Sequence, residues 1–525
     1  MKGSPVRIAH RATLVTIAAT ALALSVVPAA TAAGTPRGPA LRFSPQVVHT
    51  GTAPTGYQVK FRIYDPSANR MRIKGEWSFS SAPDIAADPT NSHPRLPDHW
   101  QPGDVPLQSP IGPNANWPVA DMVKDPATGV WSYTTPLPSG VFTYRLYRDC
   151  DAPAPDLTGC APTADPSNPP WNTRGSVETS SQVYVPADPR FGTVDYSWQA
   201  DAPTGRRGTL KDVSYPSALS TSPIGSHDLA VYLPRGYDPH RATPYPLFVL
   251  SHGGGGEQEV DWSTQGRLVQ IIDNLIAAGR IQPMVVAMTN FQNLSDAEPG
   301  YASDVRNAVI PFMEQKYNVT MSASGRAFAG TSGGATRANV LLFDNTTAFG
   351  YFGIWSAPRG LPAQGDPALA NPDLKKLLGL QLAVGNQDVG GLAGPNMADE
   401  QSRLTEAGVP FEAFKTDGGH TWDFWRKTLR DFMTKVAFRT TSTKVRVSST
   451  PAGVVLKAEI TSATAEPKTP TGKVQFSVDG KAYGAPRPLH NGVAEIVIPA
   501  HAAGSAYAAS YGGGQYYNAS AGASS

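Results

Sequence analysis

Cysteine is scarce in this chain, whose 525 residues include only two, Cys150 and Cys160. Nine residues separate the pair and no histidines cluster nearby, so the spacing does not fit a zinc knuckle. Metal binding therefore has no support, and a redox pair is disfavoured. In an exported chain, two such cysteines predict one short-loop disulfide, which stabilises a fold by about 2–3 kcal/mol.

Charge is also sparse, and neither sign dominates. Charged residues make up 16% of the chain, with 44 basic and 42 acidic side chains. Nothing in this balance calls for a nucleic-acid partner. Apolar residues make up 40%, an ordinary share for a globular protein, which argues against general disorder. At about 150 residues per domain, the length predicts three or four compact units.

Long hydrophobic runs are absent except near the start of the chain. There, a basic segment precedes an apolar run at 12–27, and the small-residue site Ala30-Thr31-Ala32 follows. This order is typical of a secretory signal peptide, which we place at residues 1–32. The run is shorter than the about 20 residues that a membrane-spanning helix needs. We therefore expect export, an extracellular location and no membrane anchor.

Glycine and proline are abundant, with 50 and 49 residues, and they predict many turns and short strands. Residues 33–56 lack periodicity and are expected to form a flexible lead-in. Residues 57–200 contain short segments that mostly alternate apolar and polar side chains, which predicts an all-β sandwich domain. Its expected strands are Val59–Tyr64, Met71–Phe79, Val130–Thr135, Val141–Tyr147 and Gln182–Val185. The segment between Ser80 and Pro118 is expected to be a loop.

Residues 206–438 change pattern, because short apolar strands now alternate with segments of helical period. This alternation predicts an α/β domain, a mostly parallel sheet with helices on both faces. The expected strands are Leu229–Tyr232, Leu247–Leu250, Met284–Met288, Ala327–Ala329, Tyr351–Trp355, Leu380–Val384 and Phe411–Phe414. The expected helices are Leu268–Ala278, Ser303–Lys316, Ala335–Phe343, Met397–Ala407 and Trp422–Val436. A functional site should lie at the carboxyl ends of the strands. Residues 440–525 return to alternating strands and predict a second all-β domain.

A candidate nucleophile lies between one of these strands and the following helix. Residues 330–334 read GTSGG, so Ser332 occupies the sharp strand-to-helix turn of a nucleophile elbow. The amide of Gly333 begins the helix and points to where a tetrahedral oxyanion would form. A second donor should follow an earlier strand, and the four glycines at 253–256 allow backbone amides to approach a ligand closely.

A serine hydroxyl needs a general base beside it and an acid that orients the base. In this kind of fold, the chain order is serine, acid, histidine. Within the α/β domain, His420 is the only histidine that follows Ser332, so it is the expected base. Asp388 directly follows a strand and is the preferred acid. Asp417 is the rival, but it lies only three residues before the base.

Four motifs, in order, are LFVLSHGGGGEQEVDW, AFAGTSGGATRA, LAVGNQD and DGGHTWDFWR. Together they resemble the esterase D and feruloyl esterase-like family of α/β-hydrolases, which also includes acetylxylan esterases, siderophore esterases and mycolyltransferases. The resemblance implies an α/β-hydrolase fold over about residues 206–437. It implies that Ser332 is the nucleophile, His420 the base and Asp388 the acid. It also implies an oxyanion hole formed by the amides of Gly254 and Gly333. Relatives often carry a bulkier residue in place of Gly333.

The flanking segments carry resemblances of their own. Residues 57–148 resemble the Ig-like early-set domain related to glycogen-binding modules, and the tail resembles bacterial Ig-like repeats. Such domains bind polymer in some relatives and serve as packing partners or spacers in others. Three tryptophans lie close to the site motifs. The default interpretation is that each packs in the core, and the alternative is that they form an aromatic wall that contacts the substrate. They are Trp262, Trp422 and Trp425.

The combined expectation is an exported three-domain serine esterase that works through an acyl-enzyme without a cofactor. The resemblances favour feruloyl or acetyl esters of plant polysaccharide as substrates. Transfer of the acyl group to an alcohol, as in mycolyltransferases, or a siderophore or other specialised ester is an open alternative. A hypothesis of another class is a catalytically idle protein whose β domains bind polysaccharide. The intact set of Ser332, Asp388 and His420 argues against that last hypothesis.

Overall fold

The computed structural model describes residues 43–524 except 44, 88–93, 108–116, 172–178, 255–257, 389–392, 463–468 and 515–516. The predicted signal peptide at 1–32 lies outside the described residues. In the described part of the chain, no helix combines the length and the apolar character needed to cross a membrane.

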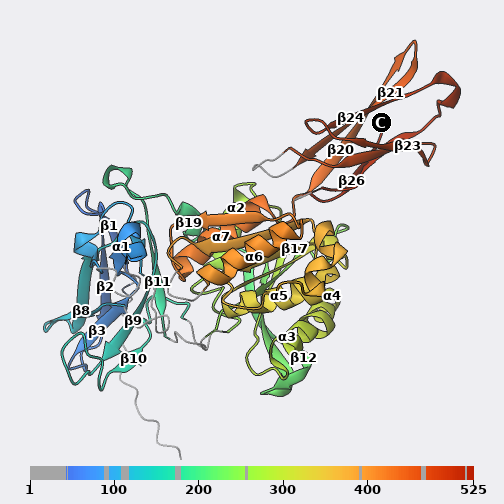
Figure 1. Ribbon diagram of the computed structural model, residues 1–525. Helices are drawn as coiled ribbons and strands as arrows, with labels where there is room; N and C mark the ends of the chain where they lie inside the picture. Colours follow the sequence, from blue (N-terminus) through green and yellow to red (C-terminus); the bar gives the residue numbers. More distant parts are fainter. Residues whose placement is uncertain are drawn as a thin grey trace, which may run out of the picture. The chain divides into compact units, whose positions relative to one another are not determined.

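An eight-stranded sheet has the order β12-β13-β15-β14-β16-β17-β18-β19, and Figure 1 labels its strands β12, β17 and β19. The first two pairs, β12–β13 and β13–β15, are antiparallel, and the other five pairs are parallel, which agrees with the predicted mostly parallel sheet. The bounds are β12 Thr209–Thr221, β13 Ile224–Leu233, β14 Leu247–Ser251, β15 Val285–Thr289, β16 Arg326–Thr331, β17 Tyr351–Trp355, β18 Gly379–Gly385 and β19 Glu412–Thr416. Strand β12 was not among the expected strands, because this edge strand is mostly exposed and lacks an apolar run.

Helices cover both faces of this sheet. On one face, α2 and α7 pack in one hydrophobic cluster, and on the other face α3 to α6 pack in a second. The bounds are α2 Leu268–Ala277, α3 Ala297–Asp304, α4 Ile310–Lys316, α5 Gly333–Asp344, α6 Gly394–Glu406 and α7 Trp422–Lys435. The helix expected from Ser303 begins six residues earlier and contains a π-helical segment, Val305–Val309, between α3 and α4.

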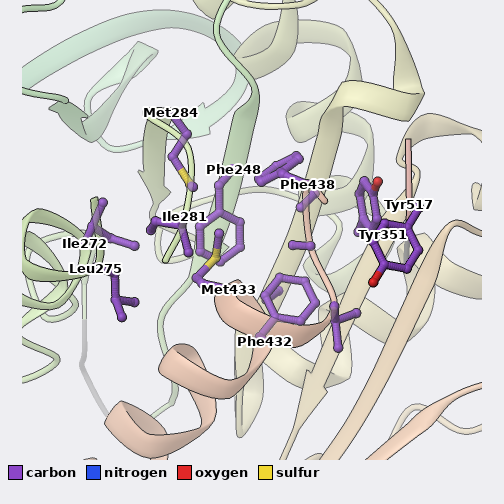
Figure 2. Close-up of a cluster of buried hydrophobic side chains, with 14 of the residues drawn as sticks. Phe248, Ile272, Leu275, Ile281, Met284, Tyr351, Phe432, Met433, Phe438 and Tyr517 are labelled. Atoms are coloured by element: carbon purple, nitrogen blue, oxygen red, sulfur yellow. The ribbon is translucent and has the colours of Figure 1, made fainter. Parts of the chain in front are cut away.

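The cluster under α7 shows how the sheet is anchored (Figure 2). Phe248 of β14 lies beside Met433 and packs against Phe432 of α7, with ring centroids 5.8 Å apart. The cluster continues to Tyr351 of β17, whose ring meets Phe438 edge-on at 5.4 Å. Burying one side chain of this size contributes about 1.5–3 kcal/mol. The helix that follows the expected base is thus held firmly to the sheet.

Residues 46–185 form further strands in two sheets, ordered β1-β2-β8-β7 and β10-β9-β3-β6, with β11 paired to β9. They share a core that contains Phe61, Trp77 and Trp131. The bounds are β1 Gln46–His49, β2 Tyr57–Tyr64, β3 Met71–Gly75, β6 Val119–Asp121, β7 Val123–Asp125, β8 Val130–Pro136, β9 Gly140–Arg148, β10 Ala161–Thr163 and β11 Ser181–Val185. The predicted disulfide between Cys150 and Cys160 is present.

Two expectations for this segment are wrong in part. The predicted flexible lead-in contains β1, because its four residues pair antiparallel with β2 and gain order from the neighbouring strand. The predicted loop between Ser80 and Pro118 contains a short helix, α1 Ala82–Ala87, and a small ladder between β4 Phe79–Ser80 and β5 Val105–Pro106. These elements are too short for a periodic pattern to reveal them.

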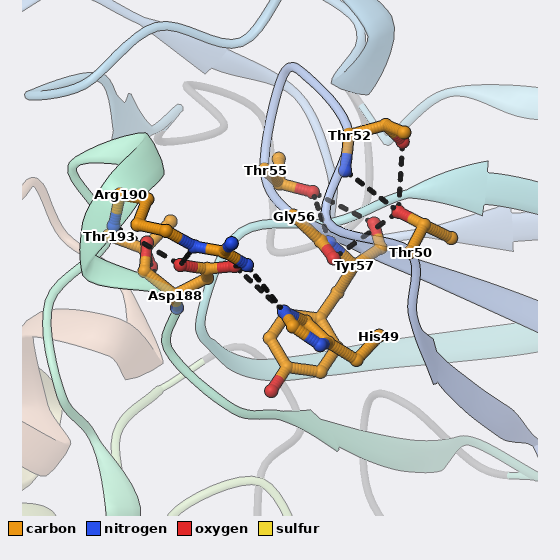
Figure 3. Close-up of polar contacts among 9 residues, drawn as sticks. All are labelled: His49, Thr50, Thr52, Thr55, Gly56, Tyr57, Asp188, Arg190 and Thr193. Carbon is orange, nitrogen blue, oxygen red and sulfur yellow. Dashed lines mark hydrogen bonds and ion pairs between the residues drawn. The ribbon is translucent and has the colours of Figure 1, made fainter.

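A cluster of polar contacts ties β1 to the chain beyond β11 (Figure 3). The Asp188 carboxylate accepts hydrogen bonds from Arg190 Nη2 at 2.7 Å and pairs with His49 Nε2 at 2.8 Å. These partners hold the pKa of Asp188 well below its usual value, chiefly through the bonds from Arg190. The His49 ring also packs on Tyr57 of β2, at a centroid distance of 4.7 Å. Side-chain contacts therefore support the four-residue strand.

After α7, the chain forms two antiparallel sheets, ordered β20-β21-β24 and β23-β22-β25-β26. The bounds are β20 Thr441–Thr450, β21 Gly453–Ser462, β22 Lys473–Val478, β23 Lys481–Pro488, β24 Val493–Ile498, β25 Tyr507–Tyr511 and β26 Ser520–Ala523. The two sheets share buried side chains such as Leu456, Phe476 and Ile496. The division of the chain into domains at 57–200, 206–438 and 440–525 stays a prediction.

Candidate active site

Ser332 lies on a strained turn between β16 and α5. Its backbone angles are φ 51° and ψ −116°, in a region that side-chain-bearing residues rarely adopt. The surrounding backbone leaves no room for larger residues. A Cβ on Gly334 would lie 2.2 Å from the carbonyl oxygen of His252, so glycine is needed for this close approach. A serine with strained backbone angles on a crowded strand-to-helix turn has the geometry of a nucleophile elbow.

Three loops, at the carboxyl ends of β16, β18 and β19, bring Ser332, Asp388 and His420 together. His420 Nε2 lies 2.8 Å from Ser332 Oγ, and His420 Nδ1 lies 3.0 Å from Asp388 Oδ2. The Asp388 side chain has no exposed surface, and that of His420 is 14% exposed. A buried carboxylate can hold the imidazole in the tautomer whose Nε2 accepts a proton from the serine hydroxyl. The arrangement is able to generate a serine nucleophile.

Asp417 has a different place. Its Oδ1 accepts hydrogen bonds from Asn386 Nδ2 at 2.9 Å and Gln387 Nε2 at 3.1 Å. These bonds lower the pKa of Asp417, so the carboxylate stays charged. Asp417 thus joins the loop that carries Asp388 to the loop that carries His420. Of the two acids that the sequence left in competition, Asp388 is the one that contacts the imidazole.

The two glycines expected to stabilise an oxyanion lie side by side. A Cβ placed on Gly333 would be 3.3 Å from the backbone nitrogen of Gly254 and 3.4 Å from its Cα. Gly254 itself has open space where its side chain would be. A larger residue at 333 would therefore press on the neighbouring loop.

His252 controls the orientation of that loop. Its Nδ1 lies 2.7 Å from the carbonyl oxygen of Gly253, and the amide of Phe291 donates to its Nε2 at 3.2 Å. A carbonyl oxygen can only accept, so Nδ1 carries the proton of the neutral ring, and Nε2 accepts from the Phe291 amide. In a trans peptide, the C=O and N–H groups point in opposite directions. With the Gly253 carbonyl turned to His252, the Gly254 amide points away from it.

His252 is fully buried, and its pKa falls to about 3, chiefly because burial disfavours the charged form. The neutral ring stacks on Phe291 at a centroid distance of 4.0 Å. Sequence reasoning missed both the anchoring role of this histidine and the presence of Phe291. Only its position in the sequence could have indicated a place near the site, because Phe291 follows the carboxyl end of β15.

The three tryptophans considered as a substrate wall lie in the core. Trp262 has no exposed surface, and its ring meets Trp355 and Trp422 edge-on at 5.7 Å and 5.1 Å. Neighbouring aromatic rings enclose Trp262, so its burial favours core packing over the alternative of substrate contact. Trp422 and Trp425 are each only 4% exposed. Trp425 meets the His420 ring edge-on at 5.0 Å and helps to hold the imidazole in place.

Comparison with known proteins gives one family match, over residues 220–435, to the Esterase family, described as "Putative esterase". An endo-1,4-beta-xylanase/feruloyl esterase from Xylanibacter ruminicola is 28% identical over 323 residues, which are 59% of this chain and 40% of that protein. Endo-1,4-beta-xylanase Y from Acetivibrio thermocellus is 33% identical over 129 residues, 22% of this chain and 12% of that protein. This chain thus spans less than half the length of either relative.

Among solved structures, a feruloyl esterase module from Clostridium thermocellum complexed with sinapinate is similar, with a TM-score of 0.40 and 23% identity. The match covers 46% of this chain and 91% of that module.

Proposed function

We propose that the chain is a serine carboxylic-ester hydrolase, because residues 220–435 match the model of the Esterase family. The observation that carries the proposal is the continuous contact from Asp388 through His420 to the hydroxyl of Ser332. The strained backbone of Ser332 supports the same assignment, because such a turn is costly and is kept where it presents a reactive side chain.

In the first half of the reaction, Ser332 Oγ attacks the ester carbonyl carbon while His420 Nε2 takes the hydroxyl proton. The carbonyl oxygen becomes an oxyanion, and the amides of Gly254 and Gly333 donate to it. The resulting imidazolium is stabilised by the charge of Asp388. When the tetrahedral intermediate collapses, His420 returns the proton to the leaving alkoxide, and the alcohol departs from an acyl-enzyme on Ser332.

In the second half, His420 Nε2 takes a proton from water, and the oxygen of that water attacks the acyl carbon. The same two amides stabilise the second oxyanion. Its collapse breaks the bond to Ser332 Oγ, which regains a proton from His420, and the free acid leaves. No step requires a cofactor, because the side chains supply every proton transfer.

We propose feruloyl or acetyl esters of plant polysaccharide as the substrate class. The support is similarity: a curated relative is described as a xylanase/feruloyl esterase, and it matches 59% of this chain. We also propose that the protein is exported, as the pattern of residues 1–32 predicts and as the disulfide between Cys150 and Cys160 supports. The flanking β segments are proposed as separate domains.

The test compares the mature protein with Ser332→Ala on p-nitrophenyl acetate and methyl ferulate. Ser324→Ala is the matched control, because this exposed serine lies just before β16 whereas Ser332 lies just after it. We expect Ser332→Ala to lose at least about a thousandfold in kcat and the control to keep wild-type activity. Equal activity in all three proteins would exclude Ser332 as the nucleophile. A new sugar ester formed with an added sugar acceptor would favour acyl transfer over hydrolysis.

A further inference from the structure

A half-buried arginine lies at the rim of the candidate site, in the first turns of the helix that begins after Ser332. The guanidinium of Arg337 lies over the Phe291 ring, with its central carbon 3.6 Å from the ring centroid. Because the His252 ring covers one face of Phe291 at 4.0 Å, the guanidinium occupies the other face. His252 is buried while Phe291 and Arg337 are half-exposed, so the stack runs outward and ends in the cation.

This stack adjoins the oxyanion glycines. A Cβ on Gly333 would lie 3.4 Å from the tip of the Phe291 ring, on the side where it also meets Gly254. Arg337 Nη1 donates to the carbonyl oxygen of Gly333 at 2.9 Å. A cation is therefore bound to the backbone carbonyl of Gly333, the residue that follows the nucleophile.

The charge of Arg337 is incompletely matched. Within the described part of the chain, Arg337 forms no ion pair, and its buried Nε has no hydrogen-bond partner. The nearby carboxylate of Glu298 is already bound by Arg359 Nη2 at 3.1 Å. Burial lowers the pKa of Arg337, and the charge of Glu298 only partly opposes this effect. The Glu298 carboxylate thus pairs with Arg359 and leaves Arg337 without an ion-pair partner among the described residues.

We propose that Arg337 recognises a carboxylate group on the ester substrate, at the rim beside the oxyanion hole; this inference rests on the proposed esterase function. A guanidinium with unused donors pairs well with a carboxylate, and partial burial strengthens the interaction relative to one in water. Phe291 holds the planar cation face-on and limits the conformational entropy lost on binding. The carboxylate could belong to the acyl part or to the alcohol part of the ester.

Matched ester pairs separate these two sources. Methyl 4-carboxycinnamate and methyl 4-methylcinnamate differ by a charge on the acyl part, and carboxymethyl ferulate and propyl ferulate differ by a charge on the alcohol part. The readout is the ratio of kcat/KM for the anionic ester to that for the neutral ester. We expect Arg337→Gln to lower this ratio about tenfold in one of the two pairs, from the loss of a charged hydrogen bond.

Three further variants sharpen the test. Arg337→Lys keeps the charge and should retain part of the preference, and Glu298→Gln should raise the ratio because it removes the competing carboxylate. Arg241→Gln is the matched control, because this guanidinium also stacks on a ring, that of Tyr245 at 4.6 Å, but lies before the amino end of β14. It should leave the ratio unchanged.

An equal loss for charged and neutral esters in Arg337→Gln would overturn the proposal and limit Arg337 to holding Phe291. Unchanged ratios in both pairs would overturn it as well. If no ester is hydrolysed, the proposed esterase function fails, and calorimetry on the Ser332→Ala protein decides this inference separately. Tighter binding of the anionic than of the neutral ester of either pair to the Ser332→Ala protein, lost in the double variant with Arg337→Gln, would support it. Equal binding within both pairs would refute it.

Discussion

Glu400 of α6 is a fully buried carboxyl group, and its replacement by glutamine should change how stability depends on pH. Its Oε2 accepts one hydrogen bond, from Asn339 Nδ2 of α5 at 3.1 Å, while its Oε1 has no partner among the described residues. Burial raises the pKa of Glu400 from 4.5 to about 7, and the bond from Asn339 only partly offsets this. The native protein therefore holds this proton under conditions where the unfolded chain has lost it.

The sign and size of the effect follow from proton linkage. Between about pH 4.5 and pH 7 the native state binds one more proton than the unfolded state, so wild-type stability falls as pH rises. At about 1.4 kcal/mol per pKa unit, the shift corresponds to about 3 kcal/mol. Glutamine stays neutral at every pH and keeps the acceptor for Asn339. We expect Glu400→Gln to be more stable than wild type above pH 7 by up to about 3 kcal/mol, and to lose this advantage near pH 4.5.

The assay is urea unfolding at several pH values between about 5 and 8, with the midpoint and slope compared at each pH. Asp399→Asn is the matched control, because it removes an exposed carboxylate from the neighbouring position of the same helix. The control should follow the wild-type pH dependence. A Glu400→Gln protein whose stability falls with pH as steeply as that of wild type would refute the reasoning.

Three further predictions concern the site. Asp388→Asn should lower kcat about a thousandfold or more while Asp417→Asn lowers it far less, and a similar loss in both variants would contradict the assignment of the acid. Gly334→Ala should destabilise the protein by about 1–3 kcal/mol, because the new methyl group meets backbone, whereas Gly205→Ala, where nothing lies within 4 Å, should unfold like wild type. His252→Ala should lower kcat about ten- to a hundredfold with little change in KM, and an effect confined to KM would argue against its role in orienting the oxyanion loop.

Much of the α/β segment could be predicted from local signals. Buried parallel strands such as Tyr351–Trp355 are continuous apolar runs, and α7 has a clear helical period. Both patterns can be recognised in the sequence without knowing which segments pack beside them. The exposed edge strand β12 and the four-residue β1 have no such pattern. They are strands because a neighbouring strand supplies their hydrogen bonds.

For the site, the order of residue types along the chain pointed to Ser332, His420 and Asp388, because the turn glycines and the position of each residue after a strand are local features. Whether Asp388 or Asp417 faces the imidazole depended on how two loops cross, which no local pattern contains. The burial of Trp262 was likewise decided by rings from distant segments.

The sequence by itself determined the chemistry available: a serine in a glycine-flanked turn, a following acid and a final histidine, in a mostly parallel sheet. Only the tertiary structure decided that the Gly253 carbonyl bonds to a buried His252, and that Arg337 stacks on Phe291. The physical reason is that these contacts join strand ends far apart in the chain. Their distances and burial exist only after the sheet has formed.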